Sequence, residues 1–186
     1  MTDAADGAGF RIVGEDLVWK GRRLTKVGVL QVETPGGEVV EREVIHHPGA
    51  VAVVPLHDDG TVTLVRQYRS ALDAEIWEIP AGLRDVDGEP LATTAARELE
   101  EEAGLVASSI EHLISFHNSP GISDEEVAVY VGRGLRSVDD DRQGVEEQHM
   151  VVTRFPLAEA LAMVSDGRIT DAKTAIGLLL TARDHR

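Results

Sequence analysis

Hydrophobic and polar residues alternate along the first quarter of the chain in the way expected of half-buried strands. The alternation covers residues 10–18, 22–34 and 38–46, and the turn signal Pro35-Gly36-Gly37 separates the last two. We therefore predict a small N-terminal antiparallel β-sheet. Residues 1–9 are small, polar and acidic, and we expect them to form a disordered tail.

The remainder of the chain mixes strand patterns with helix patterns. Residues 50–56 are apolar throughout, and the turn signal Asp58-Asp59-Gly60 leads from them into a second strand over 61–68. Further strands are predicted over 75–80, 110–117, 125–131 and 148–155, and helices over 90–103, 157–164 and 171–182. Strands interspersed with helices in this way predict an α+β domain built in layers.

The helix over residues 90–103 has recognisable end signals. Pro90 stands at a plausible first helical position, and Gly104 is suited to end the helix. At about 100° per residue, one narrow stripe of the helix collects small apolar side chains. The stripe consists of Ala92, Ala96, Leu99 and Ala103. We expect this stripe to face the core and to bring the helix close to its support.

A different face of the same helix carries Glu98, Glu101 and Glu102. Like charges at this spacing are neighbours, and each such pair destabilises an isolated helix by about 0.2–0.5 kcal/mol. A solvated acidic face is the ordinary explanation for a run of glutamates. A divalent cation would offset the repulsion, since Mg²⁺ prefers carboxylate oxygens and substrate phosphate as ligands. Arg97 can pair with a neighbouring carboxylate and orient it.

Composition narrows the range of functions. The chain of 186 residues is long enough for one domain with a sizeable core. Its 18 Lys and Arg against 33 Asp and Glu give a net charge of −15, which argues against a nucleic-acid binder. The sequence has no cysteine and hence no disulfide or thiolate metal site. It also lacks the apolar runs of a membrane span or signal peptide, so we expect a cytoplasmic protein.

The segment 82–105 resembles the signature of the Nudix hydrolases, G-x5-E-x7-R-E-U-x-E-E-x-G-U, in which U is an aliphatic residue. From Glu89 to Leu105 the match is complete. Six residues instead of five separate Gly82 from Glu89, an insertion before the helix that leaves the glutamate face intact. The resemblance implies a Nudix-type α/β/α sandwich with a mixed sheet over residues 48–182, with the N-terminal β-sheet over 10–47 as a separate subdomain.

Segments outside the signature resemble the ADP-ribose pyrophosphatase subfamily. These segments are Arg66-Gln67-Tyr68-Arg69, Trp77-Glu78-Ile79-Pro80-Ala81-Gly82 and Ser119-Pro120-Gly121-Ile122-Ser123-Asp124-Glu125. Pro120 lies 15 residues beyond Leu105, where this subfamily carries a marker proline. The resemblance implies that the protein hydrolyses ADP-ribose to AMP and ribose 5-phosphate with Mg²⁺, for which Mn²⁺ can substitute.

The same resemblance implies roles for individual residues. Metal ligands are expected at Ala81 (through its carbonyl), Glu98, Glu101 and Glu102. Substrate contacts are expected at Arg42, Arg69, Glu78 and Pro120. Catalytic residues are expected at Arg97, Glu101 and a late-loop glutamate, either Glu146 or Glu147, with Glu146 weakly favoured by its distance from the next strand. Ordinary explanations stay open, such as a strand-end charge for Arg69 and a turn role for Pro120.

Two other functions fit the same sequence. A Nudix hydrolase of another nucleoside diphosphate sugar, such as GDP-mannose, would carry the same signature. A non-catalytic module that senses ADP-ribose or NAD would usually have lost signature acids, whereas this chain keeps them all. Relatives exchange strands through the N-terminal region, so a homodimer through the N-terminal sheet is implied as well. Neither nucleic acid nor membrane is expected as a partner.

Overall fold

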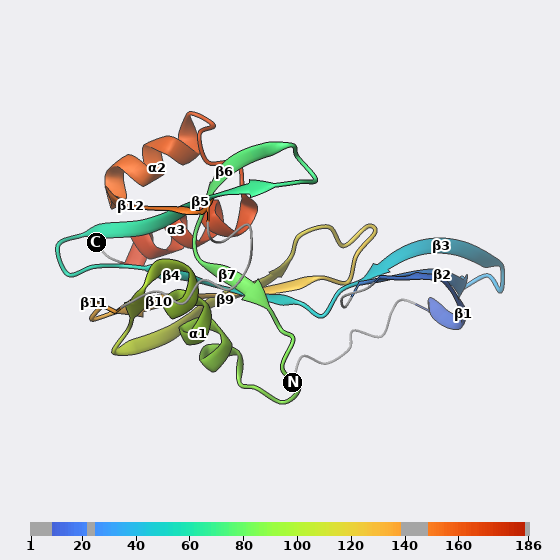
Figure 1. The fold of residues 1–186 in the computed structure, drawn as a ribbon. Helices are drawn as coiled ribbons and strands as arrows, with labels where there is room; N and C mark the ends of the chain where they lie inside the picture. Colours follow the sequence, from blue (N-terminus) through green and yellow to red (C-terminus); the bar gives the residue numbers. More distant parts are fainter. Residues whose placement is uncertain (1–8, 22–24, 139–148, 185–186) are drawn as a thin grey trace. The chain divides into compact units, whose positions relative to one another are not determined.

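The computed structural model describes residues 9–21, 25–138 and 149–184, which belong to two compact units (Figure 1). The first unit consists of Met1–Gly49 with His117–Glu126, and the second of Ala50–Phe116 with Val127–Arg186. The segment His117–Glu126, which the sequence pattern assigns to the Nudix domain, thus groups with the N-terminal sheet. Within the described ranges, no helix is long and apolar enough to cross a membrane.

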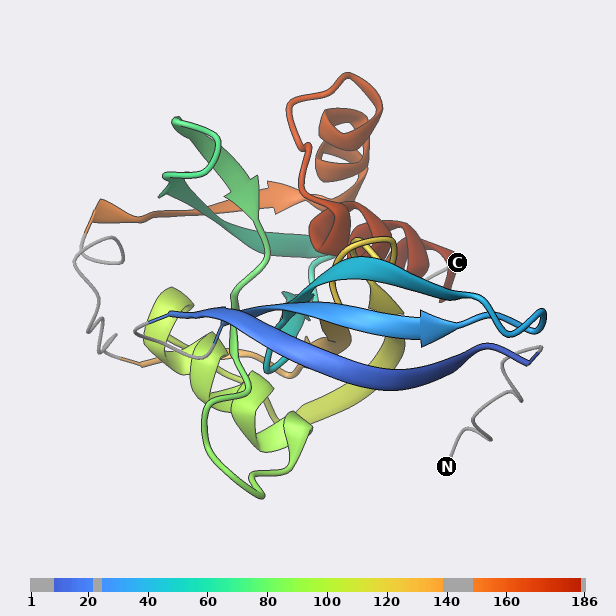
Figure 2. The same cartoon turned by 90° about the vertical axis from the view of Figure 1, so that its right-hand side faces the viewer.

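The first unit is built on the predicted three-stranded antiparallel sheet (Figure 2). Across the sheet, the strands are β1 (Arg11–Lys20), β2 (Lys26–Glu33) and β3 (Val39–His46). The segment His117–Glu126 is tied to the end of β3. The Ile45 N–H donates to the Ile122 carbonyl at 2.7 Å, and Ile45 forms a bridge with Ser123.

The second unit contains a four-stranded sheet in the order β7-β4-β10-β9. The strands are β4 (Ala50–Pro55), β7 (Ala81–Leu83), β9 (Ser109–His117) and β10 (Glu126–Arg133). Strand β4 runs parallel to β10 and antiparallel to β7, so the sheet is mixed, as the family resemblance implies. Parallel neighbours need a long connection, and here that connection includes the acidic helix.

Helices cover both faces of this sheet (Figure 1). They are α1 (Leu91–Ala103), α2 (Leu157–Ser165) and α3 (Ala172–Asp184). Val51 and Val53 of β4 pack in the core cluster of α1, whereas Ala52 and Val54 pack in the cluster of α2 and α3. Because successive side chains of a strand point to opposite faces, one apolar strand supports both helix layers. The predicted α/β/α sandwich is therefore confirmed.

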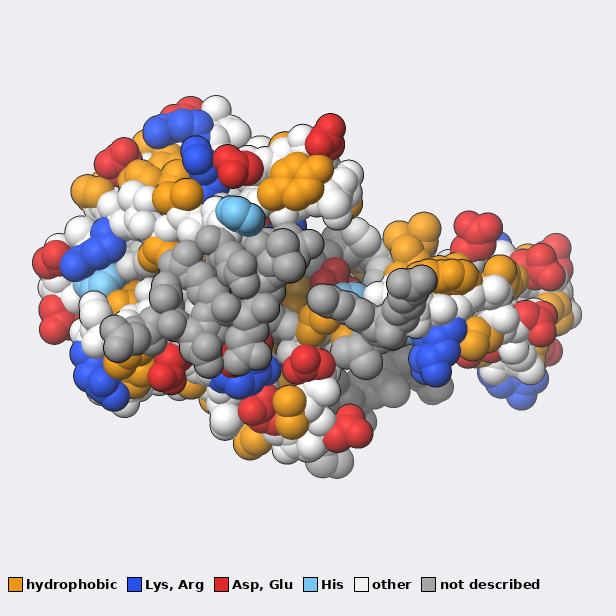
Figure 3. Space-filling view, in the orientation of Figure 1, with side chains coloured by type: hydrophobic (Ala, Val, Ile, Leu, Met, Phe, Trp, Pro, Cys, Tyr) orange, Lys and Arg blue, Asp and Glu red, His pale blue; other side chains and the backbone are white. Residues whose placement is uncertain are grey.

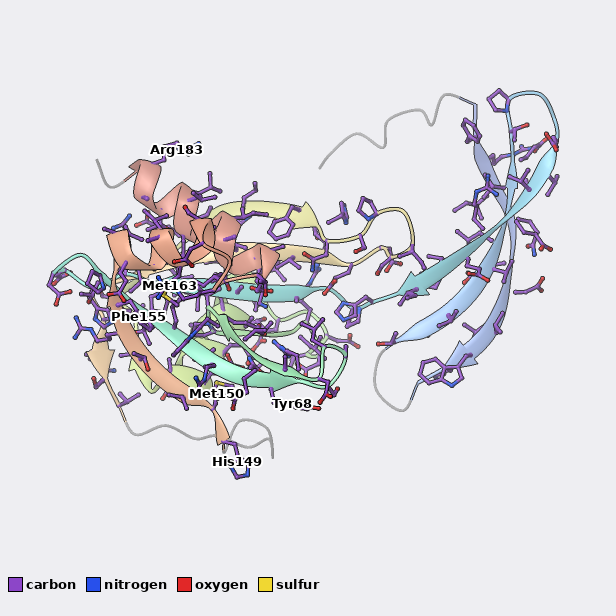
Figure 4. The ribbon with its side chains drawn as sticks, turned by 90° about the horizontal axis from the view of Figure 1, so that it is seen from above. Tyr68, His149, Met150, Phe155, Met163 and Arg183 are labelled. Atoms are coloured by element: carbon purple, nitrogen blue, oxygen red, sulfur yellow. The ribbon has the colours of Figure 1, made fainter. Side chains whose placement is uncertain are left out.

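A second sheet of three strands completes this unit. Its order is β12 (Val151–Pro156), β5 (Thr61–Arg69) and β6 (Ala74–Glu78). Trp77 of β6 meets Phe155 of β12 edge to face, with 5.1 Å between the ring centroids. Phe155 and Met163 lie close together in the core (Figure 4). The short strands β7, β8 (Leu105–Val106) and β11 (Arg136–Ser137) are too brief for periodicity to predict.

Helix α1 packs on a stripe that matches the predicted one in part, because Leu99 and Ala103 pack in the core cluster as expected. Ala92 and Ala96 are exposed, and the apolar side chains against the sheet include Leu91, Ala95 and Leu99. Leucines bury more apolar area than alanines, so their stripe faces the core. This phase also turns part of the glutamate face inwards.

The ends of α1 agree with the sequence except at Pro90. The helix begins at Leu91, and Pro90 is its N-cap with an extended backbone (φ −60°, ψ 136°). The Pro90 carbonyl accepts the Thr94 N–H at 3.2 Å, so the proline precedes the first helical residue. Gly104 ends the helix in the left-handed conformation (φ 61°), as predicted.

Candidate active site

The acidic face of α1 lies against the backbone of β7. Glu102 is 5% exposed, and one of its carboxylate oxygens accepts a hydrogen bond from the Ala81 N–H at 2.9 Å. Glu98, one turn earlier, lies beside Gly82, where an added Cβ would overlap the Glu98 carboxyl group. The missing side chain at Gly82 therefore lets the Glu98 carboxyl group approach the β7 backbone closely.

Burial removes hydration from these two carboxyl groups. Desolvation raises the pKa of Glu102 to about 8, and the nearby charge of Glu98 adds to the rise while the Ala81 hydrogen bond opposes it. Desolvation also raises the pKa of Glu98 to about 7, although Arg97 opposes the shift. A bound cation inverts this local balance. The pair therefore fits a hard divalent cation such as Mg²⁺ or Mn²⁺.

The pair on its own would supply part of a metal site. Within the described part of the chain, no three acidic or histidine side chains are arranged as a complete metal site. Mg²⁺ usually keeps several waters and takes substrate phosphate as a ligand, so two buried carboxylates suit it. Figure 3 shows further acidic side chains around α1 and the loop before it.

Arg97 contacts four carboxylates, two on α1 and two in the loop that precedes it. Its Nη1 lies 2.8 Å from Glu98 and 3.1 Å from Glu101, while Nη2 lies 3.5 Å from Asp85 and 3.7 Å from Glu89. The guanidinium thus ties α1 to the loop that precedes it. It also gives Glu98 and Glu101 a fixed orientation, the role that the sequence indicates.

A second ionic network adjoins the first. Glu78, the last residue of β6, is fully buried and accepts hydrogen bonds from Arg69 Nε and Nη2, both at 2.6 Å, and from Lys173 Nζ. Burial raises the pKa of Glu78, but the two cations outweigh burial and the pKa is lowered. The charge of Arg69 also lowers the pKa of Glu102, so the two networks are electrostatically coupled.

The family resemblance also implies site roles for Arg42, Pro120, Glu146 and Glu147. Arg42 and Pro120 belong to the first unit, where they line one groove of about 410 Å³ with Ile122 on its wall. Glu146 and Glu147 lie outside the described residues, so the late-loop base stays a prediction. The structure therefore brings together Ala81, the α1 glutamates, Arg97, Arg69 and Glu78.

The sequence pattern does not indicate Lys173 or Asp171 as site residues. Asp171 caps α3, because its Oδ2 accepts the Thr174 N–H at 3.0 Å and the Thr174 hydroxyl at 2.6 Å. The Thr174 hydroxyl in turn accepts the Ile79 N–H at 2.8 Å. An Asp before a helix is a recognisable capping signal. Nothing in the sequence indicates that this cap meets β6, 95 residues earlier.

Comparison with known protein families shows which family the chain belongs to. The NUDIX domain model matches residues 46–175, and the chain belongs to the Nudix family. The chain is 46% identical over 149 residues to the ADP-ribose pyrophosphatase of Mycobacterium tuberculosis, covering 80% of this chain and 72% of that protein. It is 36% identical over 168 residues to the ADP-ribose pyrophosphatase of Bacillus subtilis, covering 90% of both.

The chain is also similar to another bacterial protein and to a solved structure. The chain is 42% identical over 157 residues to the methanol dehydrogenase activator of Bacillus methanolicus, covering 84% of each protein. The crystal structure of an ADP compounds hydrolase matches with a TM-score of 0.80, covering 94% of this chain and 92% of that one. At 24% identity, this likeness establishes the fold alone.

Proposed function

We propose that this protein hydrolyses the diphosphate bond of ADP-ribose, releasing AMP and ribose 5-phosphate, with Mg²⁺ as its cation. The observation that carries the proposal is the pair of a partly buried Glu98 and a buried Glu102, whose raised pKa values suit a site for a divalent cation. Diphosphate hydrolysis is a reaction that such a cation promotes. The choice of ADP-ribose follows from the two pyrophosphatases to which the chain is similar.

Glu98 and Glu102 would hold the cation, and Glu101 and the Ala81 carbonyl are further candidate ligands. When bound, Mg²⁺ would neutralise charge on the diphosphate and make a water molecule more acidic, and Mn²⁺ can do the same. Arg97 holds Glu98 and Glu101 in orientation through contacts of 2.8 and 3.1 Å.

Other side chains would bind the substrate and move the proton. The partly exposed guanidinium of Arg69 would pair with diphosphate oxygens. The water oxygen bonds to one phosphorus while the bridging P–O bond breaks, and the departing phosphate keeps the electrons of that bond. Glu146 or Glu147 would take the proton from the water, a role that contributes about 10²–10⁴-fold.

A panel of substrates tests this proposal. The protein is supplied with Mg²⁺ and either ADP-ribose, GDP-mannose or NAD, and the products are identified by chromatography. We expect AMP and ribose 5-phosphate from ADP-ribose, with the largest kcat/KM of the panel, and no product after chelation. A larger kcat/KM for GDP-mannose would assign the enzyme to another sugar nucleotide. Binding of ADP-ribose without product would indicate a sensing module.

We also infer that the protein acts in the cytoplasm as a homodimer built on the N-terminal sheet. Strand β1 exposes Ile12, Val18 and Trp19, whose exposed fractions are 63%, 66% and 55%. Apolar side chains gathered on one exposed strand are typical of an interaction surface. The net charge of −15 disfavours nucleic acid as the partner, and a second copy of the chain supplies the matching apolar strand.

A further inference from the structure

We propose that Lys173 is a positioning residue of the active site, which holds Glu78 so that Glu78 holds Arg69 in the orientation that binds diphosphate. The inference rests on the proposed function and extends it beyond the signature segment. The three residues come from α3, β6 and β5, and each contacts the next.

Both carboxylate oxygens of Glu78 accept hydrogen bonds. Its side chain is 1% exposed. Oε1 accepts from Arg69 Nε, and Oε2 accepts from both Arg69 Nη2 and Lys173 Nζ. The geometry therefore favours an action of Glu78 through Arg69 over the direct substrate contact that the family resemblance implies.

Lys173 is fixed in place by two carboxylates. Its side chain is 12% exposed, and Nζ also donates to Asp171 Oδ1 at 2.9 Å. Asp171 is the cap of α3, and Thr174 links that cap to the Ile79 N–H. The ammonium group is thus held by the helix start, and the helix start is held by the strand that ends in Glu78.

The Arg69 side chain is partly accessible to solvent. It is 42% exposed, although its partner carboxylate is buried. Nε and Nη2 face Glu78, and no described residue forms a hydrogen bond with Nη1. A two-point pair between guanidinium and carboxylate fixes the plane of the guanidinium. Glu78 therefore sets the direction in which the remaining edge of Arg69 points. The charge of Arg69 is near enough to lower the pKa of Glu102.

The charges of this network are balanced in the wild type. Arg69 and Lys173 together balance Glu78 and Asp171 in this network. Without Lys173, two carboxylates would share the single cation Arg69. An uncompensated buried charge is costly, so Arg69 would be drawn towards Glu78 and Asp171 and away from substrate.

The test compares Lys173→Met and Lys173→Arg with the control Arg168→Met. Arg168 forms an exposed ion pair with Asp166 just before α3 and takes no part in the network. We expect Lys173→Met to raise KM for ADP-ribose about tenfold with a smaller change in kcat, because Arg69 is misplaced. Lys173→Arg should recover much of the loss, and Arg168→Met should match the wild type.

A double-mutant cycle distinguishes positioning from general stability. In an Arg69→Met background, Lys173→Met should add no further rise in KM, because its effect acts through Arg69. An equal rise in both backgrounds would overturn the proposal, as would a lowered Tm with unchanged KM. Lys173→Gln, which keeps a hydrogen-bond donor without the charge, carries the same test if the methionine variant does not fold.

Calorimetry with inorganic pyrophosphate and metal-free protein separates this inference from the proposed function. We expect Lys173→Met to weaken pyrophosphate binding about tenfold, because the oriented cation is lost. If that loss occurs and the wild type leaves ADP-ribose intact, the proposed function fails while the role of Lys173 stands. Equal affinity of the two proteins, or no binding by the wild type, overturns the role of Lys173.

Discussion

Two buried glutamates of the second unit, Glu78 and Glu102, have pKa values that are shifted in opposite directions. Both lose hydration, but Glu78 gains Arg69 and Lys173 and its pKa falls. Among the described residues, Glu102 gains one hydrogen bond, from the Ala81 N–H, and its pKa rises to about 8. Glu78 therefore behaves as a structural anion, whereas Glu102 has the properties expected of a carboxylate that binds a cation.

Replacing Glu102 by glutamine should separate activity from stability. We expect kcat with Mg²⁺ to fall by at least about 100-fold, because a neutral amide is a poor ligand for a hard cation. The Tm of metal-free protein should stay level or rise, since the amide replaces a buried carboxyl group that must either keep a proton well above its ordinary pKa or carry a buried charge. Glu100→Gln, at an exposed position of the same helix, is the control. Turnover close to wild type would contradict the metal role of Glu102.

Single residues differ in how well the sequence predicts them. The glutamates and Arg97 lie within one helix, so their spacing is sufficient to bring them together. Arg69 and Glu78 are contributed by paired strands, and their segments could be recognised only by resemblance. Lys173 reaches Glu78 through tertiary packing across 95 residues, which no local pattern encodes.

At the scale of elements, α1 marks the limit of periodicity as a guide. The sequence pattern indicates correctly where the helix ends and that its glutamates share a face. Of the predicted stripe, Leu99 and Ala103 pack in the core cluster, whereas Ala92 and Ala96 are exposed. Alanines satisfy either environment, so the phase of a helix depends on which larger side chains find partners.

The close approach of α1 to β7 predicts a strong effect of Gly82→Ala. The added methyl group would overlap the Glu98 carboxyl group, so either the side chain or the helix must shift. We expect kcat with Mg²⁺ to fall by about tenfold or more through displacement of Glu98. Gly36→Ala, in an open hairpin turn, is a suitable control. Equal activity of the two variants would show that Glu98 tolerates the displacement.

In the first unit, His46 links β3 to two acids. Its Nδ1 lies 2.6 Å from Asp124 and its Nε2 lies 2.7 Å from Glu15, and these hydrogen bonds raise the pKa of His46 above 6.5. The folded state thus holds this proton more tightly than the unfolded state. The resulting stabilisation is complete below pH 6.5 and is lost as the pH rises through the raised pKa.

Thermal unfolding across about pH 5 to 10 tests this linkage. The difference in Tm between wild type and His46→Gln should be largest in the acidic half of the range and should shrink as the pH rises. His149→Gln, at the exposed ring that precedes β12 (Figure 4), is the matched control substitution. A difference in Tm between wild type and His46→Gln that does not change with pH would mean that the two acids do not stabilise the protonated form of His46.

At the scale of the whole molecule, the exposed apolar side chains of β1 predict a dimer. We expect light scattering to give twice the chain mass, and Val18→Glu to lower it to the monomer mass, because a charge in an apolar interface loses hydration. Val86→Glu, at an exposed valine of the second unit, should leave the mass unchanged. A monomeric wild type, or a dimeric Val18→Glu variant, would contradict this interface.

The layered arrangement was predictable because apolar strands and amphipathic helices alternate along the chain. The grouping of His117–Glu126 with the N-terminal sheet was not, since it depends on backbone bonds such as Ile45 to Ile122. Backbone hydrogen bonds between distant segments leave no residue pattern, whereas signature side chains do.

The contact between Lys173 and Glu78 also bears on the order in which the molecule becomes functional. A ribosome delivers β6 and α1 well before α3, so the newly made chain has its acidic helix while Arg69 still lacks its distant support. Contacts between remote segments form late, after a long loop has closed. If Lys173 positions Arg69 as proposed, a new molecule reaches its full affinity for substrate when α3 docks, and the fall in KM becomes a measure of completed folding.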